Sequence, residues 1–318
     1  MKNNFREKFI FDKQNRNGGM IWRGFLNTLF TVVMWLFLAI VFIMTTYPFW
    51  YVLIYSISDP VGFSSGIQIL PHAISLRAYT SILTSARFLD AFKISFSRTL
   101  IGPVISGVVS MLIAYSLSNR DLPGRKALNW YFIITMYFGA GLIPTYLLYK
   151  SLGFVNSFRV YIIPSIVNVY GMILMRTYIE SLPAELKESA FIDGANDFKI
   201  FYSIIVPLCL PVIAAVTLFS CVHQWNAYTD TVIYNATNLK LHSLQYFLVL
   251  MVTSLAGANQ ADYAAELAMQ ASGRVGARLS PIVVRMAVTF ITIIPITLVY
   301  PFLQRYFVKG LLVGSIKG

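Results

Sequence analysis

Six apolar segments, each about 20 residues or longer, dominate the sequence. An α-helix needs about 20 apolar residues to cross the hydrocarbon core of a bilayer, so each segment is long enough to span it. The chain is therefore predicted to be an all-α polytopic membrane protein with six transmembrane helices. The predicted spans lie at roughly 27–54, 97–117, 128–148, 160–179, 204–225 and 281–302.

The composition supports a membrane protein. Hydrophobic residues make up 57% of the 318-residue chain and charged residues 12%, whereas a soluble domain carries about 25% charged residues. We attribute the net charge of +12 to Lys and Arg on the cytoplasmic side of a membrane rather than to nucleic-acid binding. Cys209 and Cys221 share one apolar segment and the three histidines are scattered, so neither a disulfide nor a metal site is predicted.

Lys and Arg near the span ends predict the orientation, since cytoplasmic loops carry an excess of both. The basic segment 1–26, the short loop 119–126, the stretch 182–207 and the tail 309–318 hold most of them. We therefore expect both termini to be cytoplasmic and residues 27–308 to form one transmembrane domain. The first apolar run is far longer than a signal-peptide core, which predicts a signal anchor that stays in the mature protein.

A charged stretch at 182–207, LPAELKESAFIDGANDFKIFYSIIVP, separates the fourth and fifth spans. Each charge at the bilayer centre costs about 2.5–3.5 kcal/mol, so its first half cannot lie in hydrocarbon. Pro183 suits the first turn of a helix, and Gly194 can end that helix in a left-handed cap. Asn196 or Asp197 can then cap a second short helix. The stretch is predicted to be a cytoplasmic helical elbow that re-enters the membrane.

The spacing within this elbow resembles the EAA loop of ABC importer permeases. Glu188-Ser189-Ala190 is followed after three residues by Gly194, and after nine more by I-x-V-P. Ser189 and Val206 stand where that family usually has Ala and Leu. The resemblance implies a coupling helix that docks into a groove on a cytoplasmic ATPase. The residues that it assigns to coupling are Glu188, Ser189, Ala190, Asp193 and Gly194.

Other segments are similar to the sugar-importer branch of these permeases, above all to the second permease of maltose-type transporters. They are GLIPTYLLYKSLGFVNS, SNRDLPGRK, the pair Trp225-Asn226 and the C-terminal tail. The resemblance implies the type I ABC importer permease fold in a bacterial inner membrane, and transport of a carbohydrate such as an oligosaccharide. It also implies a heterodimer with a second permease, two cytoplasmic ATPase subunits that bind ATP and Mg, and an external solute-binding protein. No cofactor is expected on this chain itself.

The outer loop 229–280 is far longer than two antiparallel spans require. The resemblance implies that it contacts the binding protein. Within it, the apolar piece 244–252 is too short to cross a bilayer and is expected to lie along the membrane surface. Lys93 and Arg98, near the outer end of the second span, are expected to snorkel toward the outer surface.

A carbohydrate site inside the membrane would combine aromatic faces with a few polar groups. Each candidate could equally be a packing or interface residue, and that alternative stays open. The candidates are Tyr137, Tyr146, Asn168, Tyr170, His223, Gln224 and Trp225.

Two other classes of function remain for comparison. An ion-coupled secondary transporter of a small solute would place ionisable residues in mid-membrane, whereas the charged residues here lie near the span ends. A membrane enzyme would need paired acids, a nucleophile or a metal cluster, and none stands out in the sequence. Without a phosphate-cradling P-loop, the chain is also predicted not to be its own ATPase.

Overall fold

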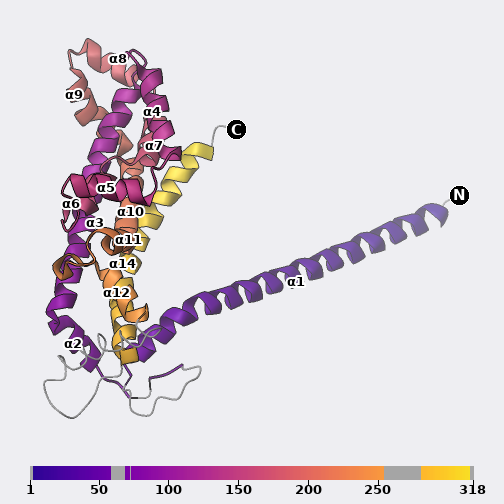
Figure 1. The fold of residues 1–318 in the computed structure, drawn as a ribbon. Helices are drawn as coiled ribbons and strands as arrows, with labels where there is room; N and C mark the ends of the chain where they lie inside the picture. Colours follow the sequence, from indigo (N-terminus) through magenta and orange to yellow (C-terminus); the bar gives the residue numbers. More distant parts are fainter. Residues whose placement is uncertain (1–2, 59–68, 72, 254–280, 316–318) are drawn as a thin grey trace.

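The fold is that of a computed structural model, which describes residues 3–58, 69–71, 73–253 and 281–315 (Figure 1). Side chains are described for 26–58, 69–71, 73–253 and 282–301. Within these ranges the regular elements are helices, with one isolated antiparallel bridge between Ser58 and Ile74. The all-α prediction is confirmed.

Four helices in the described ranges are long and apolar enough to cross a membrane. They are α1 (Asn3–Ser56), α3 (Ala86–Ser118), α10 (Val206–Asn226) and α14 (Pro281–Ser315). The portions that can span are Leu26–Ser56, Ala86–Ser118, Asp197–Asn226 and Ile282–Pro301. These four agree with the first, second, fifth and sixth predicted spans.

The third and fourth predicted spans are broken helices. Their parts are α4 (Arg125–Tyr137) with α5 (Leu142–Ser151), and α6 (Arg159–Ile162) and the 3-10 helix η1 (Ile163–Ser165) with α7 (Val169–Glu180). The first pair is bent by 113° and the second by 41°. The predicted spans 128–148 and 160–179 are thus interrupted by bends, and each pair remains apolar enough to count as one span.

Local sequence explains both breaks. Gly141 precedes α5 with φ 82° and ψ 172°, a conformation that is open almost only to glycine. Asn168 precedes α7, and its side chain accepts a hydrogen bond from the backbone N–H of Gly171 at 2.9 Å. Pro164 lies between them in η1, where it offers no N–H to a continuing helix. Mean hydropathy stays high through both breaks, so the apolar pattern did not reveal them.

Helices α3, α7 and α10 pack together at the centre of the bundle. Glycine permits their close approach: a Cβ at Gly107 would lie 2.7 Å from Oγ1 of Thr217, and one at Gly171 would overlap Cγ1 of Val216. A hydrophobic cluster, here called the inner cluster, fills the part of the bundle nearer α8. It consists of Met111, Ala114, Leu117, Met172, Met175, Ile179, Ala190, Ile200, Ile205, Cys209 and Val216.

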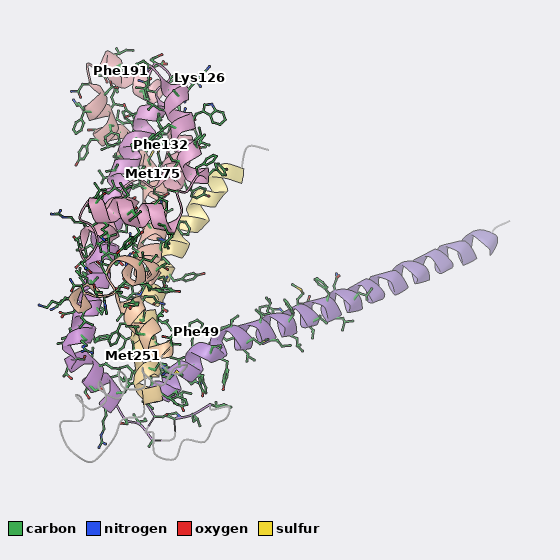
Figure 2. All side chains as sticks on the ribbon, viewed as in Figure 1. Phe49, Lys126, Phe132, Met175, Phe191 and Met251 are labelled. Atoms are coloured by element: carbon green, nitrogen blue, oxygen red, sulfur yellow. The ribbon has the colours of Figure 1, made fainter. Side chains whose placement is uncertain are left out.

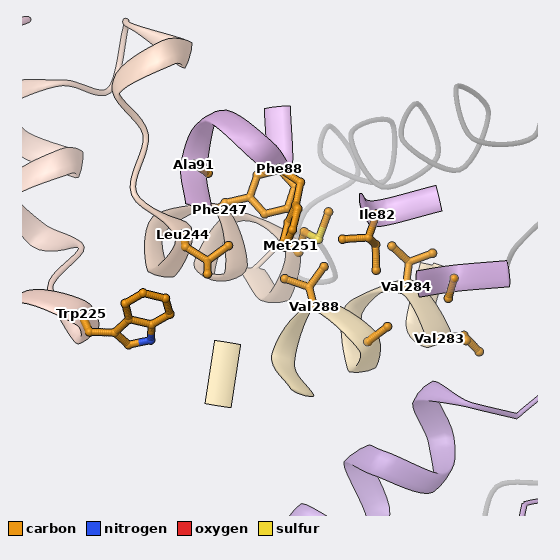
Figure 3. Close-up of a cluster of buried hydrophobic side chains, with 12 residues drawn as sticks. Ile82, Phe88, Ala91, Trp225, Leu244, Phe247, Met251, Val283, Val284 and Val288 are labelled. Atoms are coloured by element: carbon orange, nitrogen blue, oxygen red, sulfur yellow. The ribbon is translucent and has the colours of Figure 1, made fainter. Parts of the chain in front are cut away.

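A second cluster lies at the opposite end, where α2 (Arg77–Thr84) and α12 (Leu244–Thr253) pack against α3 and α14 (Figure 3). Leu244, Phe247 and Met251 of α12 are buried in it. The piece that was expected to lie along the membrane surface thus packs one face against the bundle. Three apolar side chains on one helical face find partners in α3 and α14, which removes them from both water and lipid.

The predicted elbow forms α8 (Glu185–Ile192) and α9 (Asp197–Ile200), and a π-helix (Phe201–Ile205) leads on into α10. α8 and α9 lie at the end of the bundle opposite α2 and α12 (Figure 1). Figure 2 shows Lys126 and Phe191 at this end, and Phe49 and Met251 at the other. The basic loop 119–126 and the elbow therefore share one end of the molecule.

The C-terminal part of helix α1 packs against α14. The rest of α1 extends away from the other helices (Figure 1). Its apolar side chains from Leu26 to Met44 are exposed, among them Phe30, Trp35 and Phe42 at 66, 69 and 67%. A stripe of this size has to be covered by lipid or by another protein.

Candidate functional site

The elbow has the local geometry that the sequence predicts. Glu185 and Glu188 lie in the first turn of α8, where carboxylates favour the positive end of the helix dipole. Gly194 has φ 75° with no atom within 4 Å of a Cβ position, so glycine is needed there for conformation rather than for space. Of the two candidate caps, Asn196 caps α9, because its side chain accepts a hydrogen bond from the N–H of Lys199 at 2.9 Å.

The elbow turns one small side chain inward and most of its motif outward. Ala190 is buried in the inner cluster, whereas Glu188, Ser189 and Asp193 are exposed. Four large apolar side chains of the elbow are more than half exposed and are here called the elbow patch. They are Phe191, Ile192, Phe198 and Tyr202, at 52, 86, 72 and 70%. Apolar side chains exposed beside carboxylates are typical of a protein interface.

A pocket of about 360 Å³ lies between the helices of the bundle that also contact the elbow. This volume is within the range of sites for small molecules, about 300–1,000 Å³. α3, the segment joining η1 to α7, and the last turns of α10 form its walls. The lining residues are Gly102, Pro103, Ser106, Ser165, Val167, Asn168, Phe219, Ser220, His223 and Gln224.

Two polar side chains of the pocket are already used by the fold. The Gln224 carbonyl accepts from Nε and Nη2 of Arg98 at 2.9 and 2.7 Å, and its Nε2 donates to the Tyr161 carbonyl and to Ser165 Oγ at 3.1 and 3.0 Å. Asn168, besides capping α7, donates to Ser220 Oγ at 3.3 Å. These amides shape the wall and have little capacity left for a solute.

Ser106 and His223 are the polar lining residues that remain available. Neither side chain has a hydrogen-bond partner among the described residues, and they come from α3 and α10 respectively. A hydroxyl and an imidazole can each donate or accept a hydrogen bond. The pocket is therefore equipped to bind a hydroxylated solute.

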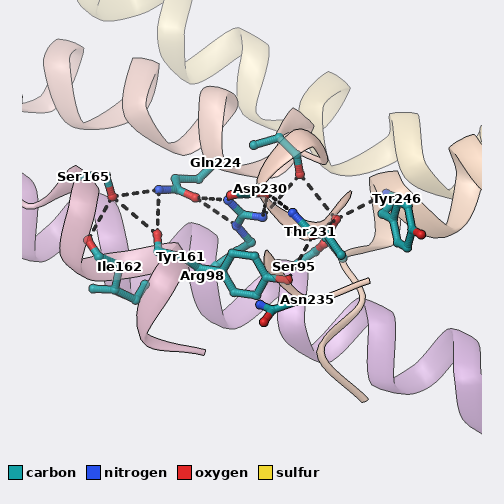
Figure 4. A network of polar contacts seen from close by, with 12 residues as sticks. Ser95, Arg98, Tyr161, Ile162, Ser165, Gln224, Asp230, Thr231, Asn235 and Tyr246 are labelled. Carbon is teal, nitrogen blue, oxygen red and sulfur yellow. Dashed lines mark hydrogen bonds and ion pairs between the residues drawn. The ribbon is translucent and has the colours of Figure 1, made fainter. Parts of the chain in front are cut away.

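Arg98 is buried beside the pocket at 1% exposure, in a polar network shown in Figure 4. Its guanidinium pairs with the Asp230 carboxylate and lies 4.2 Å from the centre of the Tyr161 ring. The Tyr161 hydroxyl in turn donates to the Leu241 carbonyl at 2.6 Å. The network joins α3, α6 and α10 to α11 (Thr229–Tyr234) and to the 3-10 helix η3 (Leu239–Leu241).

The expectation that Arg98 snorkels is wrong, because its side chain is buried, whereas the Lys93 side chain is 73% exposed. Arg98 lies 20 residues before Ser118, the end of α3 beside the elbow. That separation is about 30 Å of helix, the thickness of a hydrocarbon core. Arg98 thus lies about one such thickness from the elbow end of α3, and protein partners rather than water surround its charge. Those partners, Gln224 and Asp230, lie more than 120 residues away in sequence.

The structure brings three of the seven predicted pathway residues, Asn168, His223 and Gln224, into the pocket. The other four do not line it. Tyr137 and Tyr170 are exposed at 75 and 63%, Tyr146 stacks on Tyr234 at 5.9 Å, and Trp225 is buried with its Nε1 donating to the Thr292 carbonyl at 3.1 Å.

Sequence reasoning missed the small lining residues Gly102, Ser106, Ser165 and Ser220. A signal for the first two was the spacing of Gly102, Ser106 and Ser110 four residues apart on one face of α3. Among the described residues, no group of three or more His, Cys, Asp or Glu is placed to hold a metal ion.

No family model matches the chain. The polygalacturonan/rhamnogalacturonan transport system permease protein YtcP of Bacillus subtilis (strain 168) is 34% identical over 295 residues, which cover 92% of this chain and 99% of YtcP. The chain belongs to the family of carbohydrate ABC transporter permeases. The inner membrane ABC transporter permease protein YcjP of Escherichia coli (strain K12) is 26% identical over 289 residues, 88% of this permease and 94% of YcjP.

A solved structure is similar as well. It is the crystal structure of a bacterial ABC transporter involved in the import of the acidic polysaccharide alginate, with a TM-score of 0.77 and 29% identity. The match covers 88% of this permease and 96% of that chain. The importer permease fold predicted from the sequence is therefore confirmed.

These findings decide the function at the level of the family. The permease is a non-catalytic, multi-pass inner-membrane subunit of an ABC importer for sugars or oligosaccharides, and it binds no cofactor. It acts as one subunit of an ABC transporter. The alternative of an ion-coupled secondary transporter is set aside.

Proposed function

We propose that the permease passes an acidic oligosaccharide through its pocket, under the control of an ATPase that docks on the elbow. The observation that carries this proposal is that α3 and α10 both join the two sites. α3 contacts the elbow at Ser118 and lines the pocket at Ser106, about 18 Å away along the helix. α10 begins beside Ala190 in the inner cluster and lines the pocket near its other end.

The coupling role falls to Glu188, Ser189, Ala190, Asp193 and Gly194. Ala190 holds α8 against the bundle, while the exposed carboxylates and the elbow patch face a partner. In this proposal one of two cytoplasmic ATPases receives the elbow, and ATP and Mg bind to the ATPases. The elbow and the basic loop 119–126 share one end of the molecule, which supports a cytoplasmic position for both. We propose that both chain termini lie on that side of the membrane as well.

A second permease subunit would complete the path as a heterodimer. The exposed apolar stripe of α1 and the open side of the pocket both support such a partner. At the other membrane face, the outer loop 229–280 would receive the solute-binding protein. Its first part is anchored in the bundle by α12 and the Arg98–Asp230 pair, which gives a docked protein a firm attachment to the pocket wall.

The charge of the outer region supports an acidic substrate. The described residues 73–97, 142–165 and 227–253 hold six basic residues against two acidic ones, and Asp230 is paired with Arg98. The basic six are Arg77, Arg87, Lys93, Lys150, Arg159 and Lys240. Outer segments of membrane proteins usually carry few Lys and Arg, so this excess is unusual. A basic outer surface, here called the basic mouth, raises the local concentration of an anionic solute near the pathway. Polygalacturonan, named for YtcP, and alginate, named for the related structure, are acidic too.

Uptake by the complete transporter in proteoliposomes tests this substrate class. Oligogalacturonates and their methyl esters have the same hydroxyl groups, but esterification removes the charge. We expect faster uptake of the unesterified form, with a difference that shrinks as salt screens the basic mouth. Equal uptake of both forms at low salt would contradict the acidic-substrate proposal while leaving a neutral oligosaccharide open to the same pocket.

A further inference from the structure

We propose that Lys187 and Tyr115 form a joint, here called the elbow joint, that transmits movement of the elbow to α3. This inference rests on the proposed coupling role of the elbow and assigns positioning residues outside its motif. Lys187, on α8, places its Nζ 5.0 Å from the centre of the Tyr115 ring and donates to Ser118 Oγ at 3.4 Å. Both acceptor groups belong to the last turn of α3.

Tyr115 contacts every part of the elbow. Its ring face meets Lys187 of α8, and its hydroxyl lies 3.4 Å from both the carboxylate and the backbone oxygen of Asp197 in α9. Its ring centre is 5.1 Å from that of Phe201 in the π-helix. One side chain of α3 thus joins three successive segments of the elbow, so the elbow cannot shift as a unit without displacing this end of α3.

The environment of Lys187 differs from that of an ordinary surface lysine. Burial lowers the pKa of Lys187, and the neighbouring charges of Asp197 and Glu180 only partly offset this. A half-buried ammonium loses hydration, and the face of an aromatic ring is one of the few groups that can replace it without a bound counter-ion. Lys199, on α9 of the same elbow, is exposed. Lys187 is therefore placed to hold α8 in position against the end of α3, which a fully solvated lysine could not do.

The consequence for transport follows from the length of α3. Ser106, Pro103 and Gly102 of the pocket lie about two and a half to three and a half turns from Tyr115 on this helix. Movement of the elbow toward or away from an ATPase would reach the pocket through a helix that packs against α7 and α10. The elbow joint is the point at which that movement enters α3.

The test uses the complete transporter with its binding protein, and measures solute transported per ATP hydrolysed. Lys187→Met removes the ammonium and keeps the apolar stem, Lys187→Arg keeps a cation that stacks on tyrosine, and Lys199→Met is the matched control. We expect Lys187→Met to lower the ratio about two- to fivefold, in line with the strength of a partly exposed cation–π contact. Lys187→Arg should recover most of the loss, and Lys199→Met should match the wild type.

Three results would overturn the elbow joint: an unchanged ratio in Lys187→Met, an equal loss in Lys187→Arg, or loss of ATPase subunits from the purified complex. The last would show that Lys187 serves docking. If the Lys187→Met permease does not fold into the membrane, Tyr115→Leu removes the ring face instead and should lower the ratio more than Tyr115→Phe, which keeps the ring. Glu188→Lys, measured in parallel, separates the two proposals, because normal transport in that variant would remove the coupling role itself.

Discussion

Replacing Arg98 by methionine should destabilise the folded permease by about 3–5 kcal/mol, the usual cost of removing one partner of a buried ion pair. Arg98 is 1% exposed and donates to the Gln224 carbonyl, to the Asp230 carboxylate and to the Ala227 carbonyl. Methionine fills most of the space but donates no hydrogen bond. The Gln224 carbonyl and a partly buried carboxylate would then lose their donors in a region where little water can replace them.

The assay is the apparent unfolding temperature of the detergent-purified permease. At about 2–4 °C per kcal/mol, the temperature should fall by about 6 °C or more. Lys93→Met is the matched control: its side chain is 73% exposed, so the change should stay within about 2 °C. The double variant Arg98→Met, Asp230→Asn should lose less than the two single variants together. If Arg98→Met has the same apparent unfolding temperature as Lys93→Met, the buried pair does not stabilise the bundle and the reasoning is refuted.

Three further predictions concern packing, the pocket and topology. Gly171→Ala places a Cβ against α10 and should lower the free energy of unfolding by about 1–3 kcal/mol. Gly139→Ala, whose Cβ would have no atom within 4 Å, should leave it unchanged, and equal melting temperatures of the two variants would contradict this. His223→Leu should raise the solute concentration for half-maximal uptake about two- to tenfold, the value of one lost hydrogen bond. An unchanged value would place the solute elsewhere. Lys240→Cys should react with an impermeant external thiol reagent and Lys126→Cys should not; the opposite pattern would invert the topology.

The elbow could be predicted in detail because its determinants are local. Pro183, Gly194 and Asn196 act through backbone conformation or through hydrogen bonds that reach three residues at most. The long spans were equally accessible, since length and hydropathy decide them. The breaks beside Gly141 and Asn168 were not, because a hydropathy average ignores a single backbone angle or cap.

The pocket and the buried charge depend on contacts across the bundle, which a pattern along the chain does not contain. From its place near a span end, Arg98 was expected to reach the surface as Lys93 does. Its partners Gln224 and Asp230 lie more than 120 residues later in the sequence, so only the fold shows that it is buried. Tyrosines were favoured as sugar contacts by their chemistry, yet Tyr137 and Tyr170 are exposed and do not line the pocket. The chemistry of an aromatic ring gives no indication of which helical face it occupies.

ATP-driven uptake of an oligogalacturonate into proteoliposomes, with wild-type or Glu188→Lys permease in the complete transporter, decides whether the elbow couples ATP use to the pocket. Glu185→Lys is the matched control, since it makes the same charge change in the first turn of α8. We predict uptake that depends on ATP and on the binding protein in the wild type and in Glu185→Lys, and no uptake in Glu188→Lys. Normal uptake in Glu188→Lys, at normal assembly of the subunits, would contradict the account.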